Sequence, residues 1–133
     1  MDQGLLVGDT LTEEMIAAGE QLIQRLDKMN VLISGGCWWL RDDDIWVLVL
    51  ITPELSTAGP KALYRKVRSA SDKLDKPLQL ALKDVMVTDA KDPAVILVRM
   101  LVQTTPDGMN RARFRSASIN GQRIRDLLVY RMA

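Results

Sequence analysis

Two apolar runs on either side of three consecutive aspartates place the tightest constraint on the fold of this chain. The first run ends at Leu40 and the second begins at Ile45, and both are rich in the β-branched and aromatic residues that strands prefer. Aspartate favours turns because its side chain bonds its own backbone. We therefore predict two strands, within residues 31–40 and 45–51, that form a hairpin reversing at the aspartates.

With Asp42 and Asp43 as a two-residue loop, Trp39 faces Trp46 across this hairpin and the two rings form an aromatic pair. Both faces of the hairpin are then apolar, which predicts a central position in the sheet or a cover on each side. Trp39 and Trp46 are candidate binding residues, because a partner could dock on this tryptophan-rich surface.

The same aspartates allow a second interpretation, a metal-dependent phosphodiesterase that uses Asp42, Asp43 and Asp44. A metal site needs carboxylates that converge on one point, whereas neighbouring residues at a hairpin tip tend to splay. The next strand also lacks the glutamate-x-lysine pattern that a nuclease-like site would require. We therefore favour the turn, and we assign no catalytic residue, no metal ligand and no cofactor.

Asn120-Gly121 predicts a second hairpin near the end of the chain, because both positions of a type I′ turn need positive φ. In its register Arg115 lies opposite Asp126 as a cross-strand ion pair. One face of this hairpin gathers the candidate binding residues Arg111, Arg113, Arg115 and Tyr130. The other face carries Phe114 and Leu127 at its base and Ser118 and Arg123 at its tip.

The arginine row has two interpretations. Arginines beside a tyrosine could hold phosphates and stack on a base, so a nucleic-acid-binding protein is an alternative function. An edge strand that its charges protect against aggregation is the other interpretation. A net charge of only +1 favours the edge strand.

Helix signals lie between the two hairpins and before them. Residues 10–13 have the spacing of a capping box, so a helix is expected to start near residue 11. Gly59-Pro60 and Asp92-Pro93 open two more helices, and residues 82–88 form a short strand between them. Gly35-Gly36 suggests a bulge or a close approach of the backbone. The order α-β-β-α-β-α-β-β predicts a single α+β domain over residues 1–133, with a largely antiparallel sheet and helices packed on it.

Composition narrows the classes of function. The chain of 133 residues has no histidine and one cysteine, which excludes Ser-His and Cys-His catalysis and any internal disulfide. The N-terminus has no signal-peptide pattern, and no apolar run reaches the length of a membrane span, so we expect a cytoplasmic protein that does not bind membranes. Acidic residues gather in the first half and arginines near the end. This gradient suits an anionic partner or pairing within the chain or across a dimer.

Other landmarks are spread along most of the chain. They are the LI-x-x-LD pattern at residues 22–27, Trp46, Gly59-Pro60 with Tyr64, Asp92-Pro93, Asn120-Gly121 and Tyr130-Arg131. Together they resemble a family of small uncharacterised bacterial α+β proteins. The resemblance implies a fold of this class and no particular activity.

These observations favour a non-enzymatic binding or interaction module, expected to be a homodimer. The apolar segment over residues 94–102 is predicted to be a helix, and either this helix or the tryptophan-rich sheet would contact the partner. The ligand itself is not specified by any motif.

Overall fold

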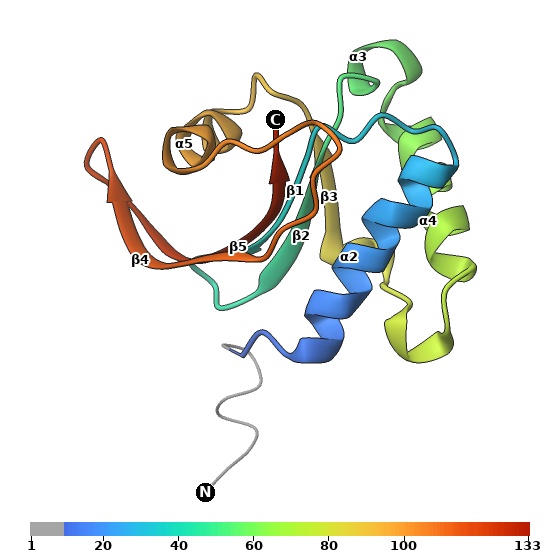
Figure 1. The fold of residues 1–133 in the computed structure, drawn as a ribbon, viewed down its shortest axis with the longest axis horizontal. Helices are drawn as coiled ribbons and strands as arrows, with labels where there is room; N and C mark the ends of the chain where they lie inside the picture. Colours follow the sequence, from blue (N-terminus) through green and yellow to red (C-terminus); the bar gives the residue numbers. More distant parts are fainter. Residues whose placement is uncertain (1–9) are drawn as a thin grey trace, which may run out of the picture.

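The structure, a computed structural model, describes residues 10–133 and arranges them as a five-stranded sheet with helices on both faces (Figure 1). The strand order is β3-β2-β1-β5-β4, and the β2–β3 pair is parallel while the other pairs are antiparallel. The elements are α2 (Glu13–Lys28), β1 (Gly35–Leu40), β2 (Trp46–Ile51), α3 (Leu55–Ala58), α4 (Pro60–Asp72), β3 (Val85–Thr88), α5 (Pro93–Leu101), β4 (Ala112–Ile119) and β5 (Gln122–Met132), with short 3-10 turns at Lys76–Leu78 and Leu82–Asp84. The α+β class and the predicted order of the main elements are confirmed. Within residues 10–133, no helix has the length and apolar character that a membrane span needs.

Helix α2 begins at a different cap from the one predicted. Thr12, rather than Thr10, is the N-cap, and its Oγ1 accepts a hydrogen bond from the backbone N–H of Met15 at 3.1 Å. The helix lays one apolar side on the sheet, as its periodicity predicts. The buried residues of this side are Ile16, Leu22, Ile23 and Leu26.

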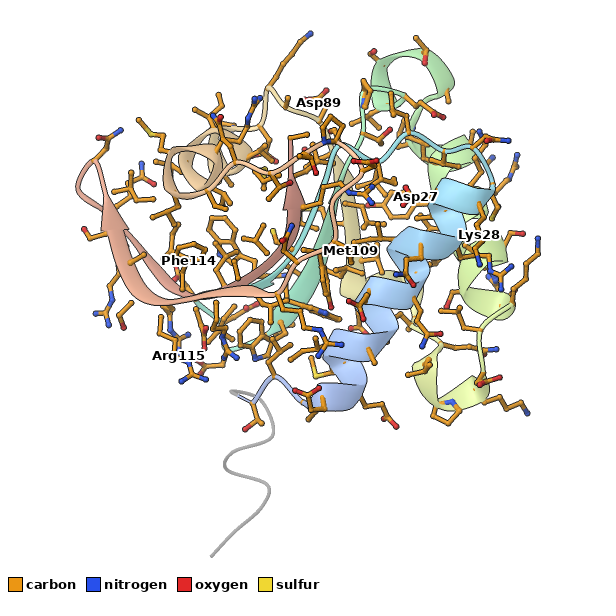
Figure 2. All side chains as sticks on the ribbon, viewed as in Figure 1. Asp27, Lys28, Asp89, Met109, Phe114 and Arg115 are labelled. Atoms are coloured by element: carbon orange, nitrogen blue, oxygen red, sulfur yellow. The ribbon has the colours of Figure 1, made fainter. Side chains whose placement is uncertain are left out.

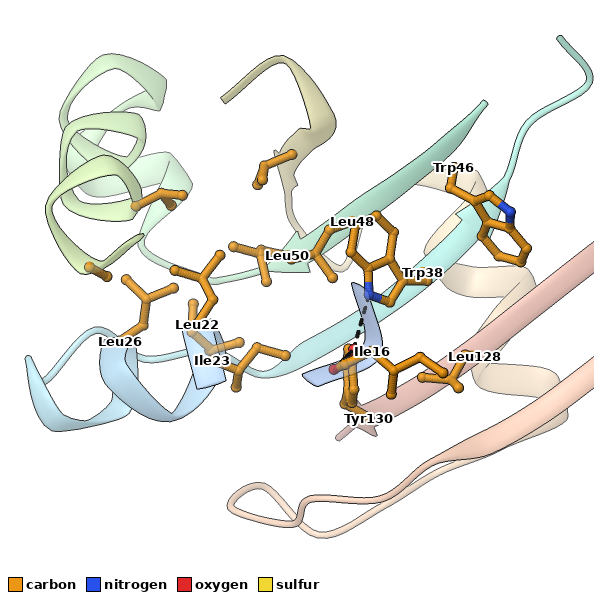
Figure 3. Close-up of a cluster of buried hydrophobic side chains, with 14 of the residues drawn as sticks. Ile16, Leu22, Ile23, Leu26, Trp38, Trp46, Leu48, Leu50, Leu128 and Tyr130 are labelled. Atoms are coloured by element: carbon orange, nitrogen blue, oxygen red, sulfur yellow. Dashed lines mark hydrogen bonds between the residues drawn. The ribbon is translucent and has the colours of Figure 1, made fainter. Parts of the chain in front are cut away.

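Helices α2 and α4 lie side by side over one face of the sheet (Figure 1). Pro60 occupies the first turn of α4, and Leu63, Val67 and Ala70 point inward from it. The strands contribute alternate side chains to the same cluster (Figure 3): Trp38, Leu40, Trp46, Leu48, Leu50, Leu128 and Tyr130. This face is the larger part of the core.

The first hairpin forms where the aspartates predict it, but its loop has three residues instead of two. Leu40 pairs with Trp46, and the backbone N–H of Asp44 donates to the Arg41 carbonyl at 3.0 Å. Asp44 takes a φ of +64°, the left-handed conformation that closes a three-residue loop. A shift of one residue moves a side chain to the opposite face, so the predicted Trp39–Trp46 pair is wrong. Trp46 faces α2, and Trp39 faces α5.

Gly35 and Gly36 provide both of the features predicted for them. The pairing of β1 with β5 shifts between Gly36 and Cys37, which is a β-bulge. A Cβ on Gly36 would lie 2.5 Å from Cδ1 of Ile23, so α2 approaches the backbone closely here. The strand starts at Gly35, later than predicted, because the Ile33 carbonyl accepts from the Arg131 guanidinium instead of from a neighbouring strand.

The C-terminal hairpin keeps its predicted register, with Arg115 opposite Asp126. Beyond them, Ser116 has a φ of +58° and the alternation of faces changes. Ala117, Ile119 and Ile124 therefore pack with Phe114 on the side of α5, so the polar face predicted for the tip is wrong. Figure 2 shows Phe114 pointing toward α5 and Arg115 pointing to the opposite side.

Helix α5 covers the second face of the sheet (Figure 1). Asp92 caps it, as predicted, through a 2.9 Å hydrogen bond from the Ala94 N–H. Its inner residues Val95 and Val98 are buried against the sheet. The predicted strand over residues 82–88 is a strand only from Val85, since a 3-10 turn precedes it.

Candidate functional site

A pocket of about 470 Å³ lies between α5 and the half of the sheet formed by β1, β2 and β3. Its apolar walls come from alternate residues of the strands and from the inner side of the helix. These wall residues are Cys37, Trp39, Val47, Val49, Ile51, Val85, Met86, Ala94, Val95, Val98 and Met132. The space exists because most of the facing side chains are short, with valines on β2 opposite valines on α5. Phe114 and Leu127 fill the other half of this face, toward β4 and β5.

Helix α5 is held at both ends, which fixes its position across the pocket. At its start, Asp92 accepts from Ala94 N and also from Thr88 Oγ1, so the cap is tied to the end of β3. After its end, the Thr104 N–H donates to the Met132 carbonyl at 2.7 Å, and Thr104 Oγ1 accepts from the Met132 N–H. The chain that leaves α5 is thereby tied to the end of β5.

Four polar side chains complete the wall of the pocket: Arg41, Tyr64, Lys83 and Asp92. Arg41 and Lys83 belong to the end near the first hairpin, since Lys83 lies in the 3-10 turn before β3 and Val85 pairs with Leu48. Tyr64 and Asp92 belong to the other end, where Ile51 pairs with Thr88. Tyr64 reaches the edge of the sheet, and its hydroxyl accepts from the Val87 N–H at 2.9 Å.

Cys37 contributes a neutral thiol to the wall. Burial raises the pKa of this thiol from 9.0 to about 12, because the apolar surroundings disfavour the thiolate. A thiol that stays protonated is a poor nucleophile. Cys37 therefore behaves as a small apolar wall residue.

The structure separates the two candidate tryptophans. Trp39 is partly exposed and lines the pocket on the α5 side. Trp46 is buried in the α2 face, and within residues 10–133 its indole N–H has no hydrogen-bond partner. The Arg113 guanidinium lies 5.6 Å from the centre of the Trp46 ring, a cation–π contact.

The arginine row lies on one face as predicted, but acidic residues of the chain occupy part of it. Arg111 pairs with Glu13 and Glu20 of α2, and hydrogen bonding to Glu20 is the main cause that raises the pKa of Arg111. Arg113, rather than Arg115, forms the bidentate pair with Asp126, at 2.6 and 2.7 Å, which raises the pKa of Arg113.

The acidic first half and the basic end of the chain therefore pair with each other. Besides the Arg111 pairs, Arg125 binds Asp44 at 2.6 Å and Arg131 binds Asp27 at 2.9 Å. Pairing within one chain was one of the two interpretations of the charge gradient. Arg115 stays exposed and forms no ion pair with the described residues.

Tyr130, the remaining candidate, is fully buried beneath α2 (Figure 3). Its hydroxyl donates to the Ile16 carbonyl and accepts from Trp38 Nε1 at 3.0 Å. Burial is the main cause that raises the pKa of Tyr130 above its usual value. In this position Tyr130 ties β5 to α2 and offers no ring face to a base.

The three aspartates form the predicted turn. Asp43 accepts from Arg41 and Asp44 accepts from Arg125, each through an ion pair on the surface. Within residues 10–133, no three acidic, cysteine or histidine side chains are placed to hold a metal ion. The carboxylates splay toward different arginines instead of converging.

The sequence does not predict that the wall residues come together to line one pocket. The valines of β2 and the residues of α5 were expected to be apolar, but nothing local indicates that they face each other across a space. Arg41 and Lys83 belong to no motif, and Tyr64 is only one of the landmarks of the family resemblance. The one available signal was the capped, nearly uncharged helix, which predicts a buried inner side.

Comparisons with known proteins add no assignment. No family model matches the chain, and no curated protein or solved structure is significantly similar to it. The resemblance to small bacterial proteins therefore stays a prediction.

Proposed function

We propose that the protein is a non-enzymatic binding module that holds a small, largely apolar molecule between α5 and the sheet. The pocket carries this proposal. Its volume of about 470 Å³ falls in the range of roughly 300–1,000 Å³ typical of small-molecule sites. Apolar walls with a few polar groups at the ends are also typical of such sites.

The chemistry of the wall supports binding rather than catalysis. The Cys37 thiol is protonated, and each Asp92 carboxylate oxygen already accepts a hydrogen bond that holds α5 in place. Arg41 and Lys83 are ion-paired at the surface. None of these groups is paired with a second group that would activate it as a nucleophile or a general base.

A neutral fluorescent probe tests the proposal. N-phenyl-1-naphthylamine, which brightens in apolar surroundings, should bind the wild-type protein. Val98→Phe places a ring inside the pocket and should weaken binding about tenfold or more. Met100→Phe places the same ring on the outer side of α5, where Met100 is exposed, and should leave binding unchanged.

Circular dichroism of both variants confirms that they are folded, and Val49→Phe provides a second blocked pocket should Val98→Phe unfold. A probe that does not brighten with the wild type, or that binds both α5 variants equally well, would contradict the proposed site.

The proposal retains the homodimer expected from the sequence. The outer side of α5 supports it, since Ile96 and Met100 are large apolar residues and are 51% and 59% exposed. The tryptophan-rich sheet gives no such support, because Trp46 is buried under α2 and the partly exposed Trp39 lines the pocket under α5. Light scattering after size exclusion should give a dimer mass at low micromolar concentration.

Met100→Lys should then give a monomer, whereas Leu32→Lys, at an exposed apolar residue outside α5, should not. A wild-type monomer would remove the homodimer and leave the pocket untouched. The alternative function, nucleic-acid binding through the arginine row, loses support. Arg111 and Arg113 already bind carboxylates of the same chain.

A further inference from the structure

The polar groups available on the pocket wall are hydrogen-bond donors. Arginine and lysine side chains carry donors and no acceptor. The Tyr64 hydroxyl already accepts from the Val87 N–H, so its own hydrogen remains to be donated. Asp92 is the acidic side chain of the wall, and both of its oxygens already accept hydrogen bonds. The wall therefore favours a ligand that supplies acceptors.

Arg41 and Lys83 line the mouth of the pocket without their carboxylate partners, and their side chains are 54% and 83% exposed. Asp43 lies 2.7 Å from the Arg41 guanidinium and Asp84 lies 3.6 Å from the Lys83 ammonium, but neither aspartate belongs to the wall. One monodentate contact leaves several of the five guanidinium N–H donors of Arg41 unused. The hairpin end of the pocket thus offers two positive groups from two different elements.

The middle of the pocket is apolar. From Arg41 and Lys83, the wall runs along Val47 and Val49 under Val98 before it reaches Tyr64. An ion in this middle region would lose its hydration without a partner, at a cost of several kcal/mol. A ligand that fits both regions has a charged end and an apolar body.

On the basis of the binding function proposed above, we propose that the ligand is a small amphipathic anion. Its carboxylate or similar anionic head contacts Arg41 and Lys83, and its alkyl or aryl body lies between β2 and α5. The two cations select the sign of the head, and the valine walls select the apolar body.

A series of single-chain amphiphiles tests this selection. Decanoate, 1-decanol and decyltrimethylammonium carry unbranched alkyl chains of about nine to ten carbons, and their heads are anionic, neutral and cationic. Each is titrated against bound N-phenyl-1-naphthylamine, below the concentration at which it forms micelles. Decanoate should displace the probe with the lowest dissociation constant, and the cation with the highest. Among the carboxylates, each added methylene should tighten binding about fourfold until the pocket is filled.

Substitutions of Arg41 and Lys83 test whether the anionic head of the ligand binds to these two residues. The double variant Arg41→Gln and Lys83→Gln removes both charged contacts, so it should weaken decanoate about tenfold or more and leave 1-decanol unchanged. Lys91→Gln removes a cation that is not part of the wall and should change neither.

The outcomes separate this inference from the function on which it rests. If 1-decanol binds as tightly as decanoate, or if the double variant binds decanoate like the wild type, the anionic ligand is excluded and the apolar pocket remains. If neither amphiphile nor probe binds, the proposed function fails as well. Flotation with phosphatidylcholine vesicles that contain phosphatidylglycerol would overturn the free small molecule in favour of a membrane lipid.

Discussion

The face of the sheet under α2 and α4 and the face under α5 use the same strands but are filled differently. On the first face, large side chains such as Trp38, Leu48 and Tyr130 interlock, and the buried polar atoms of Trp38 and Tyr130 bond to each other and to α2. On the second face, short side chains such as Val49 and Val98 leave a pocket. Dense packing and satisfied polar groups stabilise a domain, whereas unfilled space weakens it. We therefore expect the first face to contribute most of the stability, while the second face holds the pocket.

The bulge between β1 and β5 shows how the first face gains its polar contacts. The shift in pairing at Gly36 lets the consecutive residues Tyr130 and Arg131 both reach α2. Arg131 is 2% exposed and binds Asp27, Ile33 and Gly108 at once. One guanidinium thus joins the end of α2, the segment before β1 and the loop before β4.

Removing the ion pair between Arg131 and Asp27 should have the largest effect on the stability of the first face. Asp27→Ala leaves the Arg131 charge buried without its carboxylate, and should lower the free energy of unfolding by about 3 kcal/mol or more. Urea denaturation followed by circular dichroism measures the loss. Asp72→Ala, at an exposed residue of α4 with no ion pair among the described residues, is the matched control. Equal stability of the two variants would show that the junction contributes little.

Adding one methyl carbon at Gly19, where α2 meets the sheet, should lower the free energy of unfolding by a smaller amount. A Cβ on Gly19 would lie 2.5 Å from the Tyr130 hydroxyl and 2.8 Å from Trp38 Nε1. Gly19→Ala should lower the free energy of unfolding by about 1–3 kcal/mol, although alanine is the better helix former. Gly36→Ala meets the flexible end of Ile23 and should cost less, as thermal denaturation of both variants can show. A stabilised Gly19→Ala would mean that this face is looser than described.

One added methylene on each face compares their packing directly. Val67 of α4 lies in the filled cluster, so Val67→Leu should lower the free energy of unfolding by about 1–3 kcal/mol. Val49 lines the pocket, so Val49→Leu should leave it unchanged or raise it by up to about 0.8 kcal/mol, the transfer of one methylene. Chemical denaturation gives both values. The same loss in both variants would remove the distinction between the faces.

Alkaline pH should have the smallest effect, through Cys37 on the pocket side. Its folded pKa of about 12 exceeds the unfolded value of 9.0, so its stability contribution is complete below pH 9 and is lost as the pH rises toward 12. Between pH 8 and pH 10 the free energy of unfolding should fall by about 1 kcal/mol more in the wild type than in Cys37→Ala. Parallel pH profiles for the two proteins would mean that the thiol is open to solvent.

The sequence predicts those elements whose signal is local. Asn120-Gly121 specifies its turn through backbone conformation, and Asp92-Pro93 specifies a helix start, and both are confirmed. Three successive aspartates are ambiguous, because any of them can occupy a turn position. In the structure Asp44 takes the positive φ, and the register of the hairpin differs by one residue from the predicted one. Trp39 and Trp46 therefore lie on opposite faces.

Other features depend on contacts between distant segments. The positive φ of Ser116 reverses the faces at the tip of the last hairpin, and no residue pattern announces it. The alternation of the strand predicts that Arg111 shares a face with Arg113, but it does not predict the partners of Arg111, because Glu13 and Glu20 lie 98 and 91 residues away along the chain. The pocket has the same character, since it depends on where α5 is tied down at Thr88 and Met132.

The most direct test of the two-face account is a crystal structure of the protein soaked with a bromine-labelled decanoate. Anomalous scattering locates the bromine without reference to the rest of the ligand. The account predicts one bromine peak between β2 and α5, beside Val49 and Val98. A peak on the outer side of α5 beside Ile96 and Met100, or no peak at all, would contradict a ligand site inside the second face.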